Sequence, residues 1–244
     1  MKYGFIVLAL ILTGCSWMTP RPEGFVEKQI ETEYLTFAVW EKSEIEKGKP
    51  LRIYLEGDGT PNPSDKIALY YAEQDTTNNV IYMARPCQWT KDKVCQSKPE
   101  IYKEQRFHPE IIREIEEVIL YLKSKHKAPS VELIGYDGGA TVALDVAAQM
   151  NDISRVITIA GILDTNAYVH QNNLPEMTDA QNPAEKLAVL AQIPQIHYVG
   201  AKDDITPRRT AERFVSKMHH PISAVVKSVP GVNHTNWKGV KLDY

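Results

Sequence analysis

The sequence predicts a single α/β domain with a mostly parallel central sheet, helices on both faces and a short lid insertion. Short segments rich in apolar residues alternate with longer segments of helical period along most of the 244 residues. The later short segments are continuously apolar, as strands buried on both faces of a parallel sheet must be. Helical segments between such strands act as crossovers, which indicates successive βαβ units.

The predicted elements follow one another without an internal repeat. Seven segments have the composition of strands: Leu35–Trp40, Leu51–Leu55, Val80–Met83, Val131–Ile134, Val156–Ile159, Ile196–Val199 and Ala224–Val229. Four segments have the period of helices: Pro109–Lys125, Ala140–Met150, Pro183–Ala191 and Arg208–Met218. In such a sheet ligands bind beyond the carboxyl ends of the strands, so the loops that follow strands are where chemistry is expected.

The first residues have the features of a secretory signal. Lys2 precedes the apolar run Gly4–Leu12, which is too short to span a bilayer as a stable helix. The run ends in Leu-Thr-Gly-Cys15, which resembles the lipobox of bacterial lipoproteins. We therefore expect residues 1–14 to be a lipoprotein signal peptide and Cys15 to carry acyl chains such as palmitate. An ordinary secretory signal followed by an unrelated cysteine is the alternative.

The expected organisation after cleavage is simple. Residues 15–28 would form the lipidated cysteine and a polar tether, and residues 29–244 would form one domain. Each buried methylene of an acyl chain contributes about 0.8 kcal/mol to membrane binding, so this anchor should be durable. Ser16 follows the cysteine, and by the lipoprotein sorting rule this favours the periplasmic face of the outer membrane.

Charge and metal-ligand patterns exclude several classes of function. The formal net charge is −3, and Lys and Arg are scattered without a basic stripe, so we expect no nucleic-acid partner. The histidines and cysteines show no paired spacing of the kind that binds zinc, and no motif indicates a cofactor. We therefore expect neither a metal nor a cofactor.

The cysteine count fits an oxidising compartment. Of the three cysteines, setting Cys15 aside leaves Cys87 and Cys95, which are close in sequence. In the periplasm such a pair is expected to form a disulfide, and two free structural thiols are the alternative.

The segment Gly135-Tyr136-Asp137-Gly138-Gly139 joins an apolar strand to a helix of small residues. A strand, a sharp turn and a helix are the context of a G-x-S-x-G nucleophile elbow, in which glycines allow the strand and the helix to approach closely. Asp137 stands where such an elbow presents its serine. An ordinary turn with Asp137 as helix N-cap is the alternative.

Two later loops supply partners in the order that the elbow requires. The segment Gly200–Pro207 follows a strand and resembles the loop that carries the acid of the hydrolase triad, with Asp203 as the acid. His234 follows the last strand within the segment Pro230–His234. Of the seven histidines, it is the one placed where the order nucleophile, acid, histidine predicts it.

A fourth loop, Glu56–Gly59, follows the strand Leu51–Leu55. It occupies the position of the loop that donates one oxyanion-hole N–H group, here from Asp58 or Gly59, and Gly138 would donate the other. Glu56 replaces the usual histidine of this loop, and the sequence gives no role for it.

Taken together, the four loops extend over Leu51–His234, and over that range the chain resembles the α/β-hydrolase fold. More closely, blocks such as YLEGDG, ARPCQW, GYDGGA and IHYVGAKDD resemble uncharacterised proteobacterial α/β-hydrolase lipoproteins. In that family the elbow carries serine, so Asp137 is a departure.

An aspartate in this position predicts a different chemistry from that of a serine. A carboxylate attacking an ester would form an anhydride and expel an alkoxide, which is uphill. Carboxylate nucleophiles suit saturated carbon, as in the dehalogenase and epoxide hydrolase branches of the fold. We therefore expect a hydrolase of a small organic substrate in which Asp137 forms an alkyl ester and His234, oriented by Asp203, activates water.

Several features leave other functions open. Those branches have tryptophan where this chain has Gly138, and they carry a cap domain, whereas the insertion Gly161–Pro194 is short. Its Tyr168 and His170 could line a small lid or could be packing residues. Convergence of Glu56, Asp58, Asp137 and Asp203 could also leave the nucleophile protonated or attract a cation. The alternative function is a catalytically inactive hydrolase-like binding or envelope protein that has lost its serine.

Overall fold

The computed structural model describes residues 19–59, 63, 65–177 and 179–243. The signal segment and Cys15 lie outside the described residues. Within them, no helix is long and apolar enough to cross a membrane.

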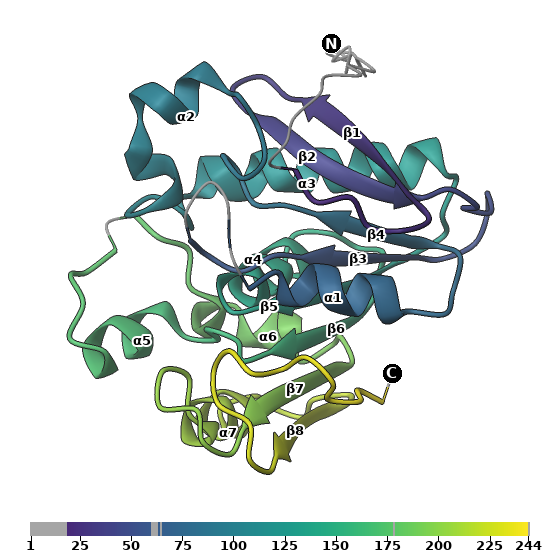
Figure 1. The fold of residues 1–244 in the computed structure, drawn as a ribbon. Helices are drawn as coiled ribbons and strands as arrows, with labels where there is room; N and C mark the ends of the chain where they lie inside the picture. Colours follow the sequence, from purple (N-terminus) through teal and green to yellow (C-terminus); the bar gives the residue numbers. More distant parts are fainter. Residues whose placement is uncertain (1–18, 60–62, 64, 178, 244) are drawn as a thin grey trace.

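The described chain forms one eight-stranded sheet with helices on both faces (Figure 1). The strands are β1 (Phe25–Glu31), β2 (Thr36–Lys42), β3 (Leu51–Leu55), β4 (Val80–Met83), β5 (Val131–Tyr136), β6 (Ile153–Ile159), β7 (Gln195–Gly200) and β8 (Ala224–Val229). Their spatial order is β1-β2-β4-β3-β5-β6-β7-β8. The pairs β1–β2 and β2–β4 are antiparallel, and the pairs from β4 to β8 are parallel.

The helices connect these strands as crossovers. They are α1 (Ile67–Gln74), α2 (Lys93–Ser97), α3 (Pro109–Lys125), α4 (Gly138–Ala147), α5 (Thr165–Gln171), α6 (Leu187–Leu190) and α7 (Arg208–Ser216), with the 3₁₀ turns η1 (Pro99–Tyr102) and η2 (Pro183–Glu185). Of the seven predicted strands, three are confirmed with identical bounds and the other four within three residues at each end. The predicted helix Pro183–Ala191 is instead a 3₁₀ turn followed by one helical turn, because Lys186 between them does not have helical backbone angles.

Two apolar clusters fill the two faces of the sheet. On one face, Ile53 and Leu133 pack with side chains of α3, α4 and α7. On the other face, Tyr54 and Ile134 pack with α1 and with Trp237 of the C-terminal segment. In Figure 1, α3 lies behind the sheet and α1 lies in front of it. Adjacent residues of one strand thus contact opposite faces, which is why these strands carry apolar residues at successive positions.

Strand β1 was not predicted, and it corrects the expected tether. The structure places Phe25 to Lys28, the last four residues of that tether, in a strand paired with β2. Its polar sequence does not have the apolar pattern of a buried strand, because an edge strand keeps much of its surface in solvent. Lys28 there donates to Glu41 of β2 at 3.0 Å.

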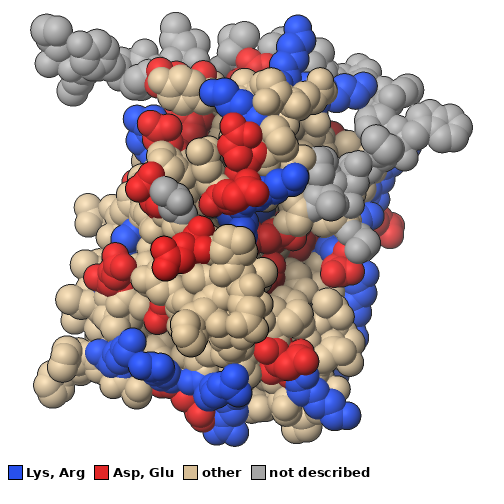
Figure 2. Space-filling view, turned by 90° about the vertical axis from the view of Figure 1, so that its left-hand side faces the viewer, with Lys and Arg blue, Asp and Glu red and all other residues tan. Residues whose placement is uncertain are grey.

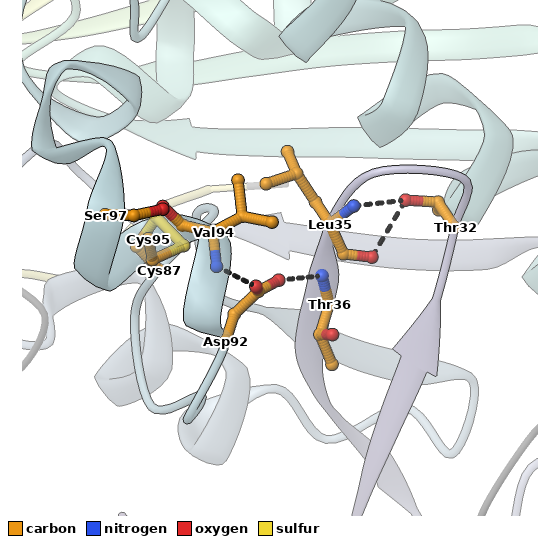
Figure 3. Close-up of a disulfide and its surroundings, with 8 residues drawn as sticks. All are labelled: Thr32, Leu35, Thr36, Cys87, Asp92, Val94, Cys95 and Ser97. Atoms are coloured by element: carbon orange, nitrogen blue, oxygen red, sulfur yellow. Dashed lines mark hydrogen bonds between the residues drawn. A yellow bond between two sulfur atoms is a disulfide. The ribbon is translucent and has the colours of Figure 1, made fainter.

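The predicted disulfide is confirmed: Cys87 and Cys95 are bonded (Figure 3). Next to it, Asp92 caps α2 by accepting from the Val94 amide, and its other oxygen accepts from the Thr36 amide of β2. The loop after β4 is therefore fastened both within itself and to the sheet.

Candidate active site

The turn between β5 and α4 has the strained geometry of a nucleophile elbow. Asp137 has φ 51° and ψ −119°, a conformation that side chains with a Cβ rarely adopt. The glycines beside it permit close packing: a Cβ on Gly135 would lie 2.3 Å from the Gly139 carbonyl oxygen, and one on Gly139 would lie 2.3 Å from the Leu55 carbonyl oxygen. The turn therefore presents the Asp137 side chain at the carboxyl edge of the sheet.

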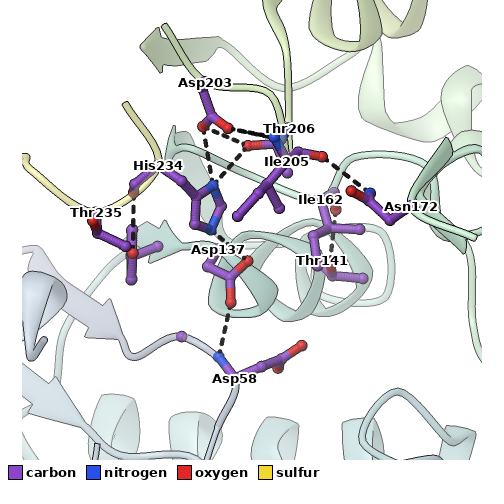
Figure 4. Close-up of polar contacts among 12 residues, drawn as sticks. Asp58, Asp137, Thr141, Ile162, Asn172, Asp203, Ile205, Thr206, His234 and Thr235 are labelled. Carbon is purple, nitrogen blue, oxygen red and sulfur yellow. Dashed lines mark hydrogen bonds and ion pairs between the residues drawn. The ribbon is translucent and has the colours of Figure 1, made fainter. Parts of the chain in front are cut away.

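The three candidate catalytic side chains meet at this edge, although they come from three separate loops (Figure 4). Asp137 Oδ1 lies 3.2 Å from His234 Nε2. His234 Nδ1 lies 3.0 Å from Asp203 Oδ2. Both ring nitrogens of the histidine thus face a carboxylate.

Asp203 is held by a small network that the sequence did not predict. Its Oδ1 accepts from the amides of Ile205 and Thr206 at 3.0 and 2.9 Å. The Thr206 hydroxyl donates to Asp203 Oδ2 at 2.9 Å and lies 3.2 Å from His234 Nδ1. On the other side, the Tyr136 hydroxyl donates to the His234 carbonyl oxygen at 3.1 Å. These contacts fix the orientation of the imidazole.

The electrostatics of this group favour three ionised side chains. Burial alone would lower the pKa of His234, but Asp137 and Asp203 together raise it to about 10. Burial alone would raise the pKa of Asp137, but hydrogen bonds from His234 and from two backbone amides hold it below its ordinary value. At neutral pH the histidine is therefore an imidazolium between two carboxylates, and Asp137 is ionised, as a nucleophile must be.

The amides expected to form an oxyanion hole point at the Asp137 carboxylate. The Asp58 amide donates to Asp137 Oδ2 at 3.2 Å, and the Gly138 amide also lowers the pKa of this carboxylate. Gly59, the other candidate from the same loop, has φ 139° and lines a neighbouring pocket. One oxygen of Asp137 thus faces the histidine and the other faces backbone donors.

Two arginines that the sequence did not indicate bind the side chain of Asp58. Arg85 Nη1 lies 2.9 Å from Asp58 Oδ1, and Arg106 Nε pairs with Asp58 Oδ2. The buried Arg85 also donates to the Arg106 carbonyl oxygen at 2.7 Å. A Cβ on Gly138 would lie 2.0 Å from the Asp58 carboxylate, so a larger residue after Asp137 would displace this cluster.

Glu56 does not lie with Asp58, Asp137 and Asp203, although the sequence left that arrangement open. It is buried and turns toward the start of α1, where it accepts from the amides of Ala68 and Leu69 at 3.3 and 3.4 Å. It also accepts from the Tyr82 hydroxyl at 3.0 Å. Lys66, at the N-cap position of α1, makes no side-chain cap, so Glu56 caps this helix from another loop.

The insertion Gly161–Pro194 contains α5, η2 and α6. Tyr168 of α5 lies within electrostatic range of Asp137: burial and that negative charge raise the pKa of its phenol to about 12, so it stays protonated. Asn172, at the end of α5, donates to the Ile205 carbonyl oxygen at 3.1 Å, which fastens the insertion to the loop of Asp203. His170 lines a different pocket, together with residues of α7.

Figure 2 views the carboxyl edge of the sheet and shows acidic side chains gathered around the middle of this face, with basic side chains along its lower edge. A pocket of about 460 Å³ adjoins the site, lined by Asp58, Gly59 and Arg106 on one side and by Leu174 and Met177 of the insertion on the other. Among the described residues, no group of three or more His, Cys, Asp or Glu side chains is arranged to hold a metal ion.

At the sequence level, no family model and no curated protein matches this chain. At the level of structure it is similar to an esterase from Pyrococcus furiosus, with 14% identity and a TM-score of 0.66 over 98% of this chain and 93% of that one. The esterase Est1E from Butyrivibrio proteoclasticus has 13% identity and a TM-score of 0.61, with 87% and 91% of the chains covered. An acylaminoacyl peptidase from Pyrococcus horikoshii has 12% identity and a TM-score of 0.58; the match covers 88% of this chain and 38% of the peptidase chain. This chain therefore has the α/β-hydrolase fold.

Proposed function

We propose that this protein hydrolyses a small organic electrophile at saturated carbon, with Asp137 as the nucleophile and an alkyl–enzyme ester as the intermediate. The observation that carries the proposal is the environment of the Asp137 carboxylate. It lies on a strained elbow, is ionised, and has one oxygen 3.2 Å from His234 Nε2 and the other 3.2 Å from the Asp58 amide.

In the first step, a carboxylate oxygen of Asp137 attacks the saturated carbon, and the bond from that carbon to its leaving group breaks. The electron pair leaves with a halide or with the oxygen of an opened epoxide. An epoxide oxygen also needs a proton, and Tyr168 supports this class because its phenol is protonated and lies near Asp137.

In the second step, esterification removes the negative charge of Asp137. The pKa of His234 then falls, because only Asp203 still stabilises the imidazolium, and its proton passes to solvent or, after the opening of an epoxide, to the Tyr168 phenolate. The neutral imidazole takes a proton from water, and the resulting hydroxide attacks the ester carbonyl carbon. The amides of Asp58 and Gly138 stabilise the oxyanion, which collapses to release an alcohol and restore the Asp137 carboxylate.

This reaction differs from those named for the similar structures. An esterase or peptidase mechanism with Asp137 as the nucleophile would pass through an anhydride and expel an alkoxide or an amine, both poor leaving groups. The likeness at 12–14% identity concerns the fold, and the reaction is inferred from the side chains at the elbow.

The experiment traps the intermediate. A His234→Gln variant can form the alkyl ester but lacks the base that hydrolyses it, so incubation with 1,2-epoxybutane or 1-bromobutane should add the mass of the alkyl group to the peptide that contains Asp137. Asp137→Asn in the same background is the matched control and should remain unmodified. Absence of the adduct with both probes, or an adduct on another residue, would contradict the proposal.

A second candidate function is binding without catalysis. The specific observation in its favour is that both Asp137 oxygens pair with groups of the chain itself, which hold the carboxylate in place. An Asp137→Ser variant tests this alternative. If it hydrolyses short acyl esters while the natural chain acts on no ester, epoxide or haloalkane, Asp137 has replaced a serine nucleophile.

We also propose that the protein is anchored by lipid on Cys15 at the periplasmic face of the outer membrane. The lipobox-like sequence before Cys15 supports this location, and the bonded pair Cys87–Cys95 is compatible with an oxidising compartment. Metabolic labelling with palmitate should modify the natural chain and should not modify Cys15→Ala. Incorporation into both chains would contradict the anchor.

A further inference from the structure

A second pocket, of about 700 Å³, lies between α5, η2 and α7. Its volume falls within the range of small-molecule sites. It is separate from the Asp137 site, since His170 and Ala167 of α5 line it whereas Tyr168 of the same helix lies near Asp137. Nothing in the function proposed above uses it.

The inner surface of this pocket is largely apolar. Ala167 and Ala184 line it, together with Phe214, a residue that is 2% exposed. The buried Asn182 is satisfied within the fold: its amide donates to Asp164 and its oxygen accepts from backbone amides. This surface would therefore contact the apolar part of a ligand.

Cationic side chains form one wall. Arg209 and Arg213 of α7 and Lys217, its C-cap residue, follow one another at four-residue spacing, and all three line the pocket. Helical residues four apart lie on one face, so these charges form a row. Figure 2 shows basic side chains along the lower edge of the carboxyl face, the part of the molecule that contains α7.

The acidic groups of the pocket leave two of these charges unmatched. Asp164 lies 4.0 Å from Lys217 and also caps α5 by accepting from the Ala167 amide. Glu185 of η2 also lines the pocket. In the described part of the chain, neither Arg209 nor Arg213 has a carboxylate partner within ion-pair distance, whereas the adjacent Arg208 pairs with Glu212 at 2.7 Å.

We propose that this pocket binds a small organic anion, with a carboxylate or phosphate head on Arg209 and Arg213 and an apolar body against Phe214. Guanidinium groups suit such heads because they donate two parallel hydrogen bonds to carboxylate or phosphate oxygens. An apolar surface next to a paired cationic wall selects an amphipathic anion over a fully hydrophilic one.

The test uses phenylphosphonate as probe and benzamide as its neutral counterpart, with binding followed by calorimetry and by amide NMR shifts. The natural chain should bind phenylphosphonate saturably, with shifts at α5 and α7, and should bind benzamide at least tenfold more weakly. The double variant Arg209→Ala/Arg213→Ala should lose at least tenfold in affinity. Arg209 and Arg213 are both exposed, so the double variant should keep its melting temperature.

Arg208→Ala is the matched control, because it removes the same charge from the same helix outside the pocket. Its affinity should stay within about twofold of that of the natural chain. Equal losses in Arg208→Ala and in the double variant, shifts confined to the Asp137 site, or no saturable binding would overturn the proposal. Vesicles that contain phosphatidate test whether the anionic head belongs to a lipid. If the natural chain binds these vesicles and the double variant does not, the ligand is a lipid. If the natural chain binds only free phenylphosphonate, the ligand is a soluble anion.

Discussion

Replacing Asp137 by asparagine should change the titration of His234 by a predictable amount. The histidine lies between Asp137 and Asp203, which raise its pKa from 6.5 to about 10 against the opposing effect of burial. That difference corresponds to about 5 kcal/mol in favour of the imidazolium. Asparagine keeps the shape of the side chain and removes one of the two negative charges. Because one adjacent opposite charge shifts a pKa by about 1–3 pH units, we expect the pKa of His234 to fall by about two pH units.

The same shift predicts how stability depends on pH. A histidine whose pKa is raised by folding stabilises the protein fully below its unfolded pKa of about 6.5. That contribution is lost as the pH rises from about 6.5 through about 10. The free energy of unfolding should therefore fall over this range in the natural chain, and it should fall by roughly half as much in Asp137→Asn.

The assay is an NMR titration of the histidine ring protons. A His234→Gln sample identifies the resonance among the seven histidines. Asp204→Asn is the control, because Asp204 is exposed and is adjacent in sequence to Asp203. The reasoning is refuted if His234 titrates near 6.5 in the natural chain, or if Asp137→Asn and Asp204→Asn shift it equally.

Three further predictions concern stability, each measured by denaturant unfolding. Gly138→Ala should cost about 1–3 kcal/mol, because its Cβ would meet the arginine-bound Asp58 carboxylate at 2.0 Å; an unchanged midpoint would mean that this carboxylate moves freely. Replacing both Cys87 and Cys95 by serine should cost about 2–3 kcal/mol from the short loop that they close, and a reducing agent should destabilise only the natural chain. Glu56→Ala should cost about 2–4 kcal/mol because it leaves buried donors at the start of α1 unpaired, whereas Glu56→Gln, which keeps an acceptor, should cost less.

The sheet, most of its strands and the three loops of the site could be predicted from the sequence because each leaves a local pattern. Strands buried on both faces are rich in apolar residues, and β5, β6 and β7 are buried along most of their length. The glycines around Asp137 are imposed by the close approach of β5 and α4, and the order in which Asp137, Asp203 and His234 occur follows from the topology. Strand β1 could not be predicted, because an edge strand does not need to be apolar on both faces.

Contacts between loops distant in sequence leave no such pattern, and the folded chain was needed to find them. Arg85 and Arg106 pair with Asp58 only because the loops after β3 and β4 lie at the same edge of the sheet. Glu56 caps a helix that begins eleven residues later, and its spacing matches no local capping motif. The charge state of the site is likewise collective, since the raised pKa of His234 arises from two carboxylates that meet only in three dimensions.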